Sequence, residues 1–153
     1  MERVLFVCLG NICRSPLAEG VMRHLVAERG LQDEIEVDSA GTGAWHVGER
    51  PDARSIEVAA RNGVSLVGQS ARKVCPADFR DFSRIVAMDA SNIRDLRTVA
   101  PTGAAADLRL LRDFDPEGGG DVPDPYYGGG DGFAEVYAMV DRSCRALLDE
   151  LVS

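Results

Sequence analysis

The sequence predicts an α/β protein, a single doubly wound domain in which a parallel sheet has helices on both faces. Short apolar runs, typical of strands buried on both sides, alternate along the chain with segments of helical periodicity. Such alternation favours a parallel sheet with right-handed crossovers. The length of 153 residues suits one domain with a hydrophobic core, and no internal repeat is visible. We therefore expect residues 1–153 to form one domain.

The first strand and the first helix flank a short polar loop. Residues 3–8 form a compact apolar run that stops at the turn-forming pair 10–11. A helix is expected from Ser15, which is a good N-cap, because Pro16 is tolerated in the first helical turn. The apolar residues that follow keep helical spacing until Gly30 interrupts the pattern.

The rest of the chain continues the alternation of strands and helices. Further strands are expected at 35–39, 84–88 and 108–111, and further helices at 52–62, 91–99 and 133–151. The only tryptophan, Trp45, lies in a loop after the second strand. An irregular stretch rich in Gly, Pro and Asp, residues 115–132, precedes the last helix, whose apolar residues form one stripe.

The chain is acidic, with 25 Asp and Glu against 17 Lys and Arg and a formal net charge of −8. An acidic protein repels nucleic acid, so we expect no DNA or RNA partner. No apolar run approaches the roughly 18 residues of a membrane span, and we expect a cytoplasmic monomer with reduced cysteines. Because only two histidines are present and Cys8 and Cys13 lack a second close pair, we expect no metal site.

The loop between the first strand and the first helix carries the chemistry. Ligands of open α/β sheets bind at this end of the strands, and backbone N–H groups at a helix N-terminus bind phosphate. Gly10 permits tight curvature, and Asn11 tolerates a left-handed backbone. In place of the lysine of an ATP-binding loop stands Cys8, followed after five residues by Arg14. The Cys8 thiolate, favoured by the helix N-terminus, could attack phosphorus while Arg14 holds two phosphate oxygens.

A hydroxyl group also belongs to this loop. Ser15 could donate a hydrogen bond to the Cys8 sulfur and make it a better leaving group. A simpler interpretation makes Cys8 a core thiol and Arg14 a surface residue, but it gives the polar turn at 10–11 no purpose. We therefore favour a phosphate-binding loop over residues 8–15.

Taken together, these segments resemble the low-molecular-weight protein tyrosine phosphatases. Residues 7–19 are similar to the family's active-site segment, and residues 38–42 with Trp45, 88–92 and 124–128 are similar to its other segments, in the same order. The resemblance implies a four-stranded parallel sheet of order 2-1-3-4 and hydrolysis of phosphotyrosine and small aryl phosphates through a cysteinyl-phosphate intermediate. It also implies no metal, no cofactor and a tyrosine-phosphorylated protein as substrate.

The resemblance assigns the catalytic roles. Cys8 is the expected nucleophile, Arg14 binds the phosphate, and Asp124 is the general acid and then the general base. Asp121 is the nearest competitor for the acid role. Neither histidine is an attractive proton donor, because His24 is expected on a helix surface and His46 near the pocket mouth, where it could serve recognition. The phosphate is expected to contact the loop residues Leu9, Gly10, Asn11, Ile12, Cys13, Arg14 and Ser15.

The substrate pocket is expected, by the same resemblance, to have an apolar lining. Leu9 and Ile12 lie at its floor and sides, and Trp45, Tyr126 and Tyr127 form aromatic walls; ordinary packing is the alternative for each aromatic residue. Bacterial phosphoarginine phosphatases of this family carry threonine where this chain has Ile12. The apolar side chain therefore favours phosphotyrosine over a guanidinium-bearing substrate.

Three polar residues match the family's network that supports the loop: Asn11, Ser15 and Ser39. One departure is Gln69, which falls near the place where many members have a histidine of that network. We expect the polar support to be arranged differently there and the activity to survive.

The remaining cysteines suggest a redox role or simple packing. Cys13 matches the family's second cysteine, and a reversible Cys8–Cys13 disulfide would protect the nucleophile from over-oxidation; a packing role is the alternative. Cys75 and Cys144 are expected to be structural.

Three other functions share parts of this pattern. A thioredoxin-coupled arsenate reductase has the same fold and loop but needs a further pair of resolving cysteines, and Cys75 stands alone in its region. A phosphoarginine phosphatase is disfavoured by Ile12. A non-catalytic phosphopeptide-binding module would need neither Cys8 nor Asp124.

Overall fold

A sheet of four parallel strands forms the centre of the computed structural model, which describes the whole chain except residues 127–129 and, at 130 and 131, only the backbone. The strands are β1 (Glu2–Cys8), β2 (Ile35–Gly41), β3 (Arg84–Ala87) and β4 (Asp107–Leu110). Their order across the sheet is β2-β1-β3-β4, and every neighbouring pair is parallel. The structure thus confirms the predicted α/β fold and its strand order.

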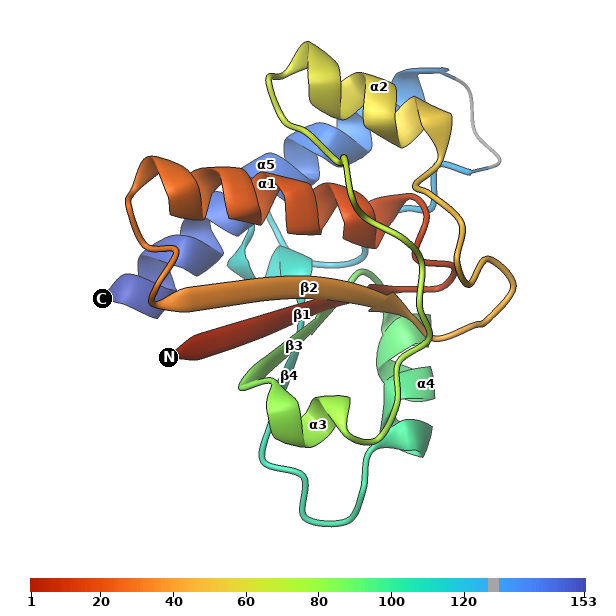
Figure 1. Cartoon of the computed structure of the whole chain (residues 1–153), viewed down its shortest axis with the longest axis vertical. Coiled ribbons are helices and arrows are strands. Elements are labelled where there is room, and N and C mark those ends of the chain that lie inside the picture. Colours follow the sequence, from red (N-terminus) through yellow and green to blue (C-terminus); the bar gives the residue numbers. More distant parts are fainter. Residues whose placement is uncertain (127–129) are drawn as a thin grey trace.

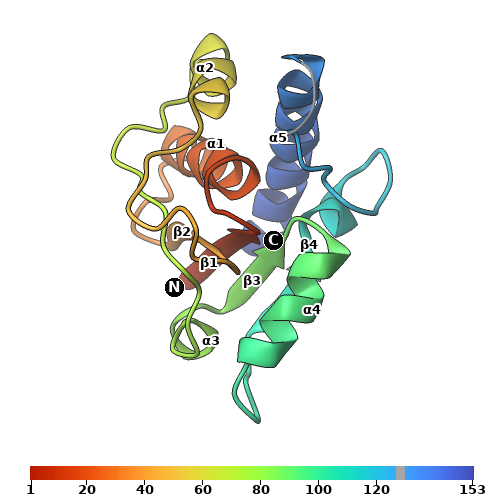
Figure 2. The same cartoon turned by 90° about the vertical axis from the view of Figure 1, so that its right-hand side faces the viewer.

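Helices cover both faces of this sheet (Figure 1). On one face lie α1 (Arg14–Glu28) and α5 (Gly130–Val152), with α2 (Ala53–Arg61) packed against both. The other face carries α3 (Asp78–Asp81) and α4 (Ala90–Val99), as the end-on view in Figure 2 shows. A short 3-10 helix, η1 (Leu111–Phe114), follows β4. Among the described residues, no helix is long and apolar enough to cross a membrane.

The central strand β1 contributes side chains to two separate cores. Val4 and Phe6 pack with the apolar faces of α1 and α5, whereas Leu5 and Val7 face the α3 and α4 side. All four side chains are completely buried. A side chain of this kind contributes about 1.5–3 kcal/mol when it is fully buried. This burial on both faces explains why the strand has no alternating polar residues.

The start of α1 differs from the sequence expectation. The N-cap is Cys13, and Ser15 lies inside the first turn of the helix. Ser15 does not cap the helix because its hydroxyl group contacts Asn11 and Cys8 instead. The short elements α3 and η1 were not predicted, since four residues are too few for a periodic pattern to be recognised.

The carboxyl ends of the parallel strands meet at one edge of the sheet, where the loops that follow β1, β2, β3 and β4 converge (Figure 1). Chain segments far apart in the sequence therefore become neighbours at this edge. The segment after β4 leads through η1 to Asp124, and the segment after β1 contains Cys8 and Arg14.

The turn after η1 is held by a buried carboxylate. The side chain of Asp115 is fully buried and accepts hydrogen bonds from Arg112 Nε at 2.9 Å and Arg142 Nε at 2.8 Å. It also accepts one from the backbone N–H of Glu117 at 2.9 Å. Burial alone would raise the pKa of Asp115, but these donors lower it from 3.8 to about 2. The turn is thereby joined to η1 and α5.

Replacing Asp115 with Asn should lower the free energy of unfolding at neutral pH and matter much less in acid. At about 1.4 kcal/mol per pKa unit, the lowering of the Asp115 pKa from 3.8 to about 2 corresponds to about 2.5 kcal/mol. Because the folded pKa is the lower one, this contribution is present above the unfolded pKa and is lost as pH falls through about 2. Urea unfolding at neutral pH and near pH 2 measures the effect.

The matched control for this experiment is Asp149→Asn. The side chain of Asp149 is 67% exposed and pairs with Arg29, so its loss should change stability by at most about 1 kcal/mol. An Asp115→Asn variant as stable as this control at neutral pH would contradict the anchoring role of Asp115.

Candidate active site

The sulfur of Cys8 lies where β1 ends, within reach of two hydrogen-bond donors from the same loop. Cys8 is 2% exposed, and its Sγ accepts a hydrogen bond from the backbone N–H of Asn11 at 3.3 Å. Ser15 Oγ lies 3.0 Å from the sulfur. Since Asn11 Nδ2 already donates to Ser15 Oγ at 2.8 Å, the hydroxyl hydrogen of Ser15 is free to point at the sulfur. Two donors thus converge on Sγ.

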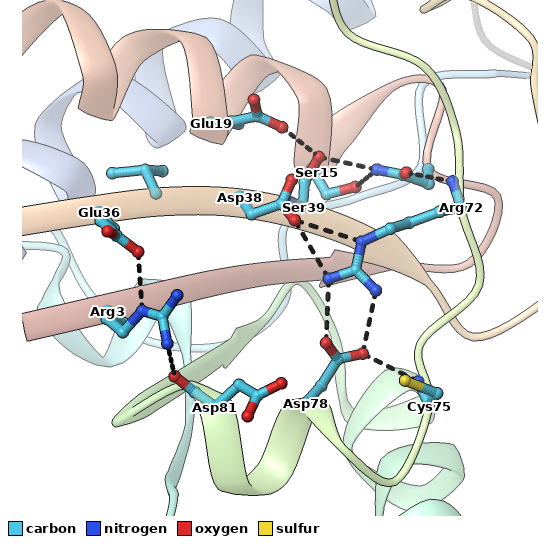
Figure 3. Close-up of polar contacts among 12 residues, drawn as sticks. Arg3, Ser15, Glu19, Glu36, Asp38, Ser39, Arg72, Cys75, Asp78 and Asp81 are labelled. Atoms are coloured by element: carbon cyan, nitrogen blue, oxygen red, sulfur yellow. Dashed lines mark hydrogen bonds and ion pairs between the residues drawn. The ribbon is translucent and has the colours of Figure 1, made fainter.

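The carboxamide of Asn11 fixes the loop in its shape. Asn11 has a φ of 57°, a left-handed conformation that asparagine adopts more readily than most residues. Its Nδ2 also donates to Ser39 Oγ at 3.0 Å, and its Oδ1 accepts from the backbone N–H of Arg72 at 3.0 Å. Ser39 in turn donates to Glu19 Oε1 at 2.6 Å. This chain of polar contacts links β2, α1 and the segment around Arg72 to the loop (Figure 3).

Two members of this network were not predicted from the sequence: Glu19 and Arg72. Glu19 is 4% exposed, and burial raises its pKa, opposed by the hydrogen bond from Ser39 and the charge of Arg23. The Arg72 guanidinium lies between Asp38 at 3.2 Å and Asp78 at 3.0 Å (Figure 3). These ion pairs hold the backbone that donates to Asn11. No local sequence pattern indicates the role of either residue, because each acts through a contact with a residue distant in sequence.

Arg14 is a buried cation with partners from two other loops. It is 2% exposed; its Nη1 donates to Asp89 Oδ2 at 2.6 Å and to the carbonyl of Val122 at 2.9 Å. Burial disfavours the charged form, yet the Cys8 thiolate and the hydrogen bond to Asp89 hold the pKa of Arg14 above its ordinary value. Asp89 lies two residues after the end of β3 and is the N-cap of α4. The sequence marked this strand end without giving Asp89 a role.

Asp124 comes from the segment after β4 and lies beside Arg14. Its Oδ1 accepts a hydrogen bond from the backbone N–H of Tyr126 at 3.0 Å, and its Oδ2 is 3.7 Å from Arg14 Nη2. The side chain is 38% exposed, so a proton can reach it from solvent. Asp121, the competitor for the acid role, instead accepts a hydrogen bond from the backbone N–H of Ala90 at 3.1 Å.

These groups surround one pocket of about 400 Å³. The sulfur of Cys8 lies near its base, whereas Trp45 is 72% exposed and stands at its rim. Tyr127 lies outside the described residues. In the part of the chain that the structure describes, no three His, Cys, Asp or Glu side chains are grouped to hold a metal ion. The lining residues are Cys8, Leu9, Gly10, Ile12, Cys13, Arg14, Trp45, His46, Asp124 and Tyr126.

The two histidines lie as expected, one in the pocket lining and one on the surface. His46 Nδ1 is 2.9 Å from Glu49 Oε2, and the ring of His46 is 6.4 Å from that of Tyr126. His24 contacts Glu28 along the exposed side of α1. His46 is therefore placed to contact a substrate, whereas His24 is not.

Gln69 does not take part in the network around Asn11. Its Nε2 donates to the carbonyl of Pro16 at 3.1 Å, and its buried Oε1 has no hydrogen-bond partner among the described residues. The polar support is thus arranged differently at this position, as expected.

The cysteines other than Cys8 occupy three different environments. Burial, followed by the charge of Asp52, raises the pKa of Cys13 to about 12, so its thiol stays protonated at neutral pH. Cys144 is fully buried in the core, as expected. The expectation that Cys75 is structural was wrong: its side chain is exposed, and its hydrogen bonds with Asp78 are made by its backbone N–H and carbonyl.

A sulfur, a guanidinium and a carboxylate line this one pocket, and comparison with known proteins identifies the family of the chain. Residues 3–153 match the family model of the low molecular weight phosphotyrosine protein phosphatases. The phosphatase of that name from Schizosaccharomyces pombe is 50% identical over 92% of this chain and 92% of the relative. The chain belongs to this family, and it is an enzyme of the protein-tyrosine-phosphatase class.

Two crystal structures share the fold over nearly the whole chain. A protein tyrosine phosphatase from Entamoeba histolytica matches with a TM-score of 0.93 and 38% identity, covering 99% of this chain and 97% of that one. DARP, a Drosophila arginine phosphatase, matches with a TM-score of 0.91 and 37% identity, covering 100% of this chain and 99% of that one. The fold is therefore shared with a protein that is named for a different phosphorylated residue.

Removing the Asn11 carboxamide should disorganise the loop, and two variants separate its two roles. Asn11→Ala loses the amide and keeps an unfavourable left-handed backbone, whereas Asn11→Gly loses only the amide. We expect Asn11→Ala to be the less stable by about 1 kcal/mol, measured by urea unfolding. Both variants should hydrolyse para-nitrophenyl phosphate at least about 10-fold more slowly, since Ser15 and Ser39 lose a buried donor. Full activity of Asn11→Gly would show that the amide network does not organise the site.

Proposed function

We propose that residues 1–153 form one phosphatase domain that hydrolyses phosphotyrosine through a cysteinyl-phosphate intermediate without a metal ion. Cys8 is the nucleophile, Arg14 binds the phosphate, and Asp124 is the acid and then the base. The observation that carries this proposal is the convergence of two hydrogen-bond donors on Cys8 Sγ, in a pocket that Arg14 and Asp124 also line.

In the first step, the Cys8 thiolate attacks phosphorus and the bond from phosphorus to the tyrosine oxygen breaks. Asp124 gives its proton to the departing phenolate, and the loop N–H groups with Arg14 compensate the charge on the phosphoryl oxygens. The planar fork of Arg14 suits two oxygens at once. Its Nη1 is held by Asp89 and by the carbonyl of Val122, so the guanidinium is oriented before substrate arrives.

In the second step, water attacks the phosphorus of the intermediate and the phosphorus–sulfur bond breaks. Asp124, now a carboxylate, accepts a proton from the water, and inorganic phosphate and the Cys8 thiolate result. Ser15 Oγ lies 3.0 Å from the sulfur, so it stabilises the thiolate as it leaves. The partial exposure of Asp124 lets water reach it.

The pocket lining supports an aryl substrate. Leu9, Ile12, Trp45 and Tyr126 all contribute to it, and they offer apolar surface to a phenyl ring. Cys8 is 2% exposed at the base, so the phosphate must extend inward from the peptide backbone. The side chain of phosphotyrosine has that length, whereas phosphoserine does not.

Phosphoarginine hydrolysis is the second candidate, because the chain is similar to the Drosophila arginine phosphatase DARP. A guanidinium leaving group has N–H donors that need acceptors when they enter a pocket. Ile12 is 8% exposed and lines the pocket, and its side chain has no acceptor. Phosphotyrosine is therefore the better match for this lining.

Replacing the proposed nucleophile and acid should separate their roles. We expect Cys8→Ser to abolish hydrolysis of para-nitrophenyl phosphate, because a neutral serine hydroxyl is a far weaker nucleophile than a thiolate. Asp124→Asn should lower kcat/KM for phenyl phosphate, whose leaving group needs a proton, by about 10²-fold or more. The wild-type rate should be unchanged by a metal chelator. Full activity of Cys8→Ser, or loss of wild-type activity with chelator, would overturn the mechanism.

A substitution at Ile12 tests the substrate class. We expect Ile12→Thr to raise the hydrolysis of phosphoarginine peptides relative to phosphotyrosine peptides by about 10-fold, because the new hydroxyl accepts from a guanidinium and removes apolar contact with an aryl ring. Ile12→Val, which shortens the side chain without adding polarity, is the control. A ratio that is the same in both variants would show that polarity at this position does not select the substrate.

A further inference from the structure

We propose that Arg54 is a positioning residue for Asp124, holding the segment that carries the acid against the loop that carries the nucleophile. The inference rests on the function proposed above and adds a residue outside the catalytic set. Arg54 comes from α2, the helix that contacts both the 8–15 loop and the region of Tyr126. No feature of the sequence pointed to it.

The start of α2 is fastened directly to the 8–15 loop. The backbone N–H of Asp52 donates to the carbonyl of Ile12 at 2.7 Å, and Ser55 Oγ donates to the carbonyl of Cys13 at 3.3 Å. Asp52 is also the N-cap of α2, accepting from the backbone N–H of Arg54 at 2.8 Å. The first turn of α2, which includes Arg54, is therefore fixed in position relative to the 8–15 loop.

The same aspartate orients the Arg54 side chain. Arg54 Nε lies 3.0 Å from Asp52 Oδ1, and its Nη2 lies 3.0 Å from Oδ2. This two-point contact fixes the plane of the guanidinium as well as its position. The hydrogen bond from Arg54 lowers the pKa of Asp52, so the pair stays ionised at neutral pH.

The central carbon of this guanidinium lies over two aromatic rings. It lies 5.4 Å from the ring centroid of Tyr126 and 4.7 Å from that of Phe133, within the roughly 6 Å of a cation–π contact. Phe133 is buried in the core, so it is a fixed partner. Tyr126 then connects to the acid, since its backbone N–H donates to Asp124 Oδ1 at 3.0 Å.

These contacts form a continuous path from the nucleophile loop through Asp52, Arg54 and Tyr126 to Asp124. A direct role of the Arg54 charge in attracting substrate is a weaker explanation, because Asp52 neutralises it. A role in stability alone is also weaker, since an ion pair with a half-exposed arginine contributes little. What the geometry points to is orientation of the acid carboxylate.

The decisive measurement compares leaving groups that differ in their need for a proton. Para-nitrophenolate leaves readily without protonation, whereas phenolate needs the proton of Asp124. We expect Arg54→Gln to lower kcat/KM for phenyl phosphate about 10-fold, a fraction of the 10²–10⁴-fold that proton transfer supplies, and for para-nitrophenyl phosphate at most about 2-fold. Arg61→Gln, on the same helix, where Arg61 lies 3.8 Å from Glu57, is the control and should change neither value.

Two further comparisons of variants make the outcome unambiguous. In an Asp124→Asn background, Arg54→Gln should cause no additional loss with phenyl phosphate, because its effect passes through the acid. Arg54→Lys keeps the charge but lacks the planar group, and it should resemble Arg54→Gln. It also carries the test if thermal unfolding shows that Arg54→Gln does not fold.

The proposal is overturned if Arg54→Gln affects both substrates by the same factor, or if its effect persists undiminished in the Asp124→Asn background. A loss of kcat/KM in Arg54→Gln that diminishes as salt is added, and that is absent in Arg54→Lys, would instead make Arg54 a charge contact for substrate. That outcome would also overturn the proposal. The proposed function fails separately, if Asp124→Asn itself lowers kcat/KM equally for both substrates.

Discussion

A buried guanidinium is the constraint around which the site is built. Arg14 is 2% exposed, and a charge at such a depth is costly unless anions and hydrogen-bond acceptors surround it. Asp89 comes from the loop after β3, and the carbonyl of Val122 and the carboxylate of Asp124 come from the segment after β4. Satisfying one side chain therefore requires three loops to meet at the same edge of the sheet. Bound phosphate would complete the set of anions.

The second organising feature is the direction of the hydrogen bonds that lead to the sulfur. Ser39 donates to Glu19, so its oxygen is left to accept from Asn11. Asn11 donates to Ser15 as well, which leaves the Ser15 hydrogen for Cys8. The carboxylate of Glu19, at one end of this series of hydrogen bonds, thus determines which atoms donate at the other end. An acceptor-only group in the position of Glu19 is what gives the network a single polarity.

The fold could be predicted from the sequence because its signals are local. The apolar run of β1, the helical spacing of α1 and the stripe of α5 each lie within one segment, and parallel strands separated by helices have few arrangements. The order β2-β1-β3-β4 came from family resemblance and is confirmed. The start of α1 was predicted wrongly, because the hydroxyl of Ser15 is used by Cys8 and Asn11 rather than for capping.

The site could be predicted only in part, because many of its contacts join residues that are distant in the sequence. Cys8 and Arg14 are neighbours on one loop, so their pattern is visible in the sequence. Asp89 contacts Arg14 across 75 residues, and Arg72 contacts Asn11 across 61. An aspartate or arginine on the surface of a helix or loop looks the same in a sequence as one that ends a network. Only the meeting of strand ends at one edge distinguishes them.

The two halves of the site are attached to the fold in different ways. The 8–15 loop continues directly from β1, whose backbone pairs with β2 and β3 on both sides. Asp124 follows a long irregular segment that is held by side chains, among them the buried carboxylate of Asp115, and by a backbone hydrogen bond from Val122 to Met88 at 2.8 Å. Backbone pairing leaves a strand little freedom, whereas side-chain contacts can form and break locally. The position of the acid therefore depends on side chains from several elements, whereas the position of the nucleophile depends on the backbone of the sheet.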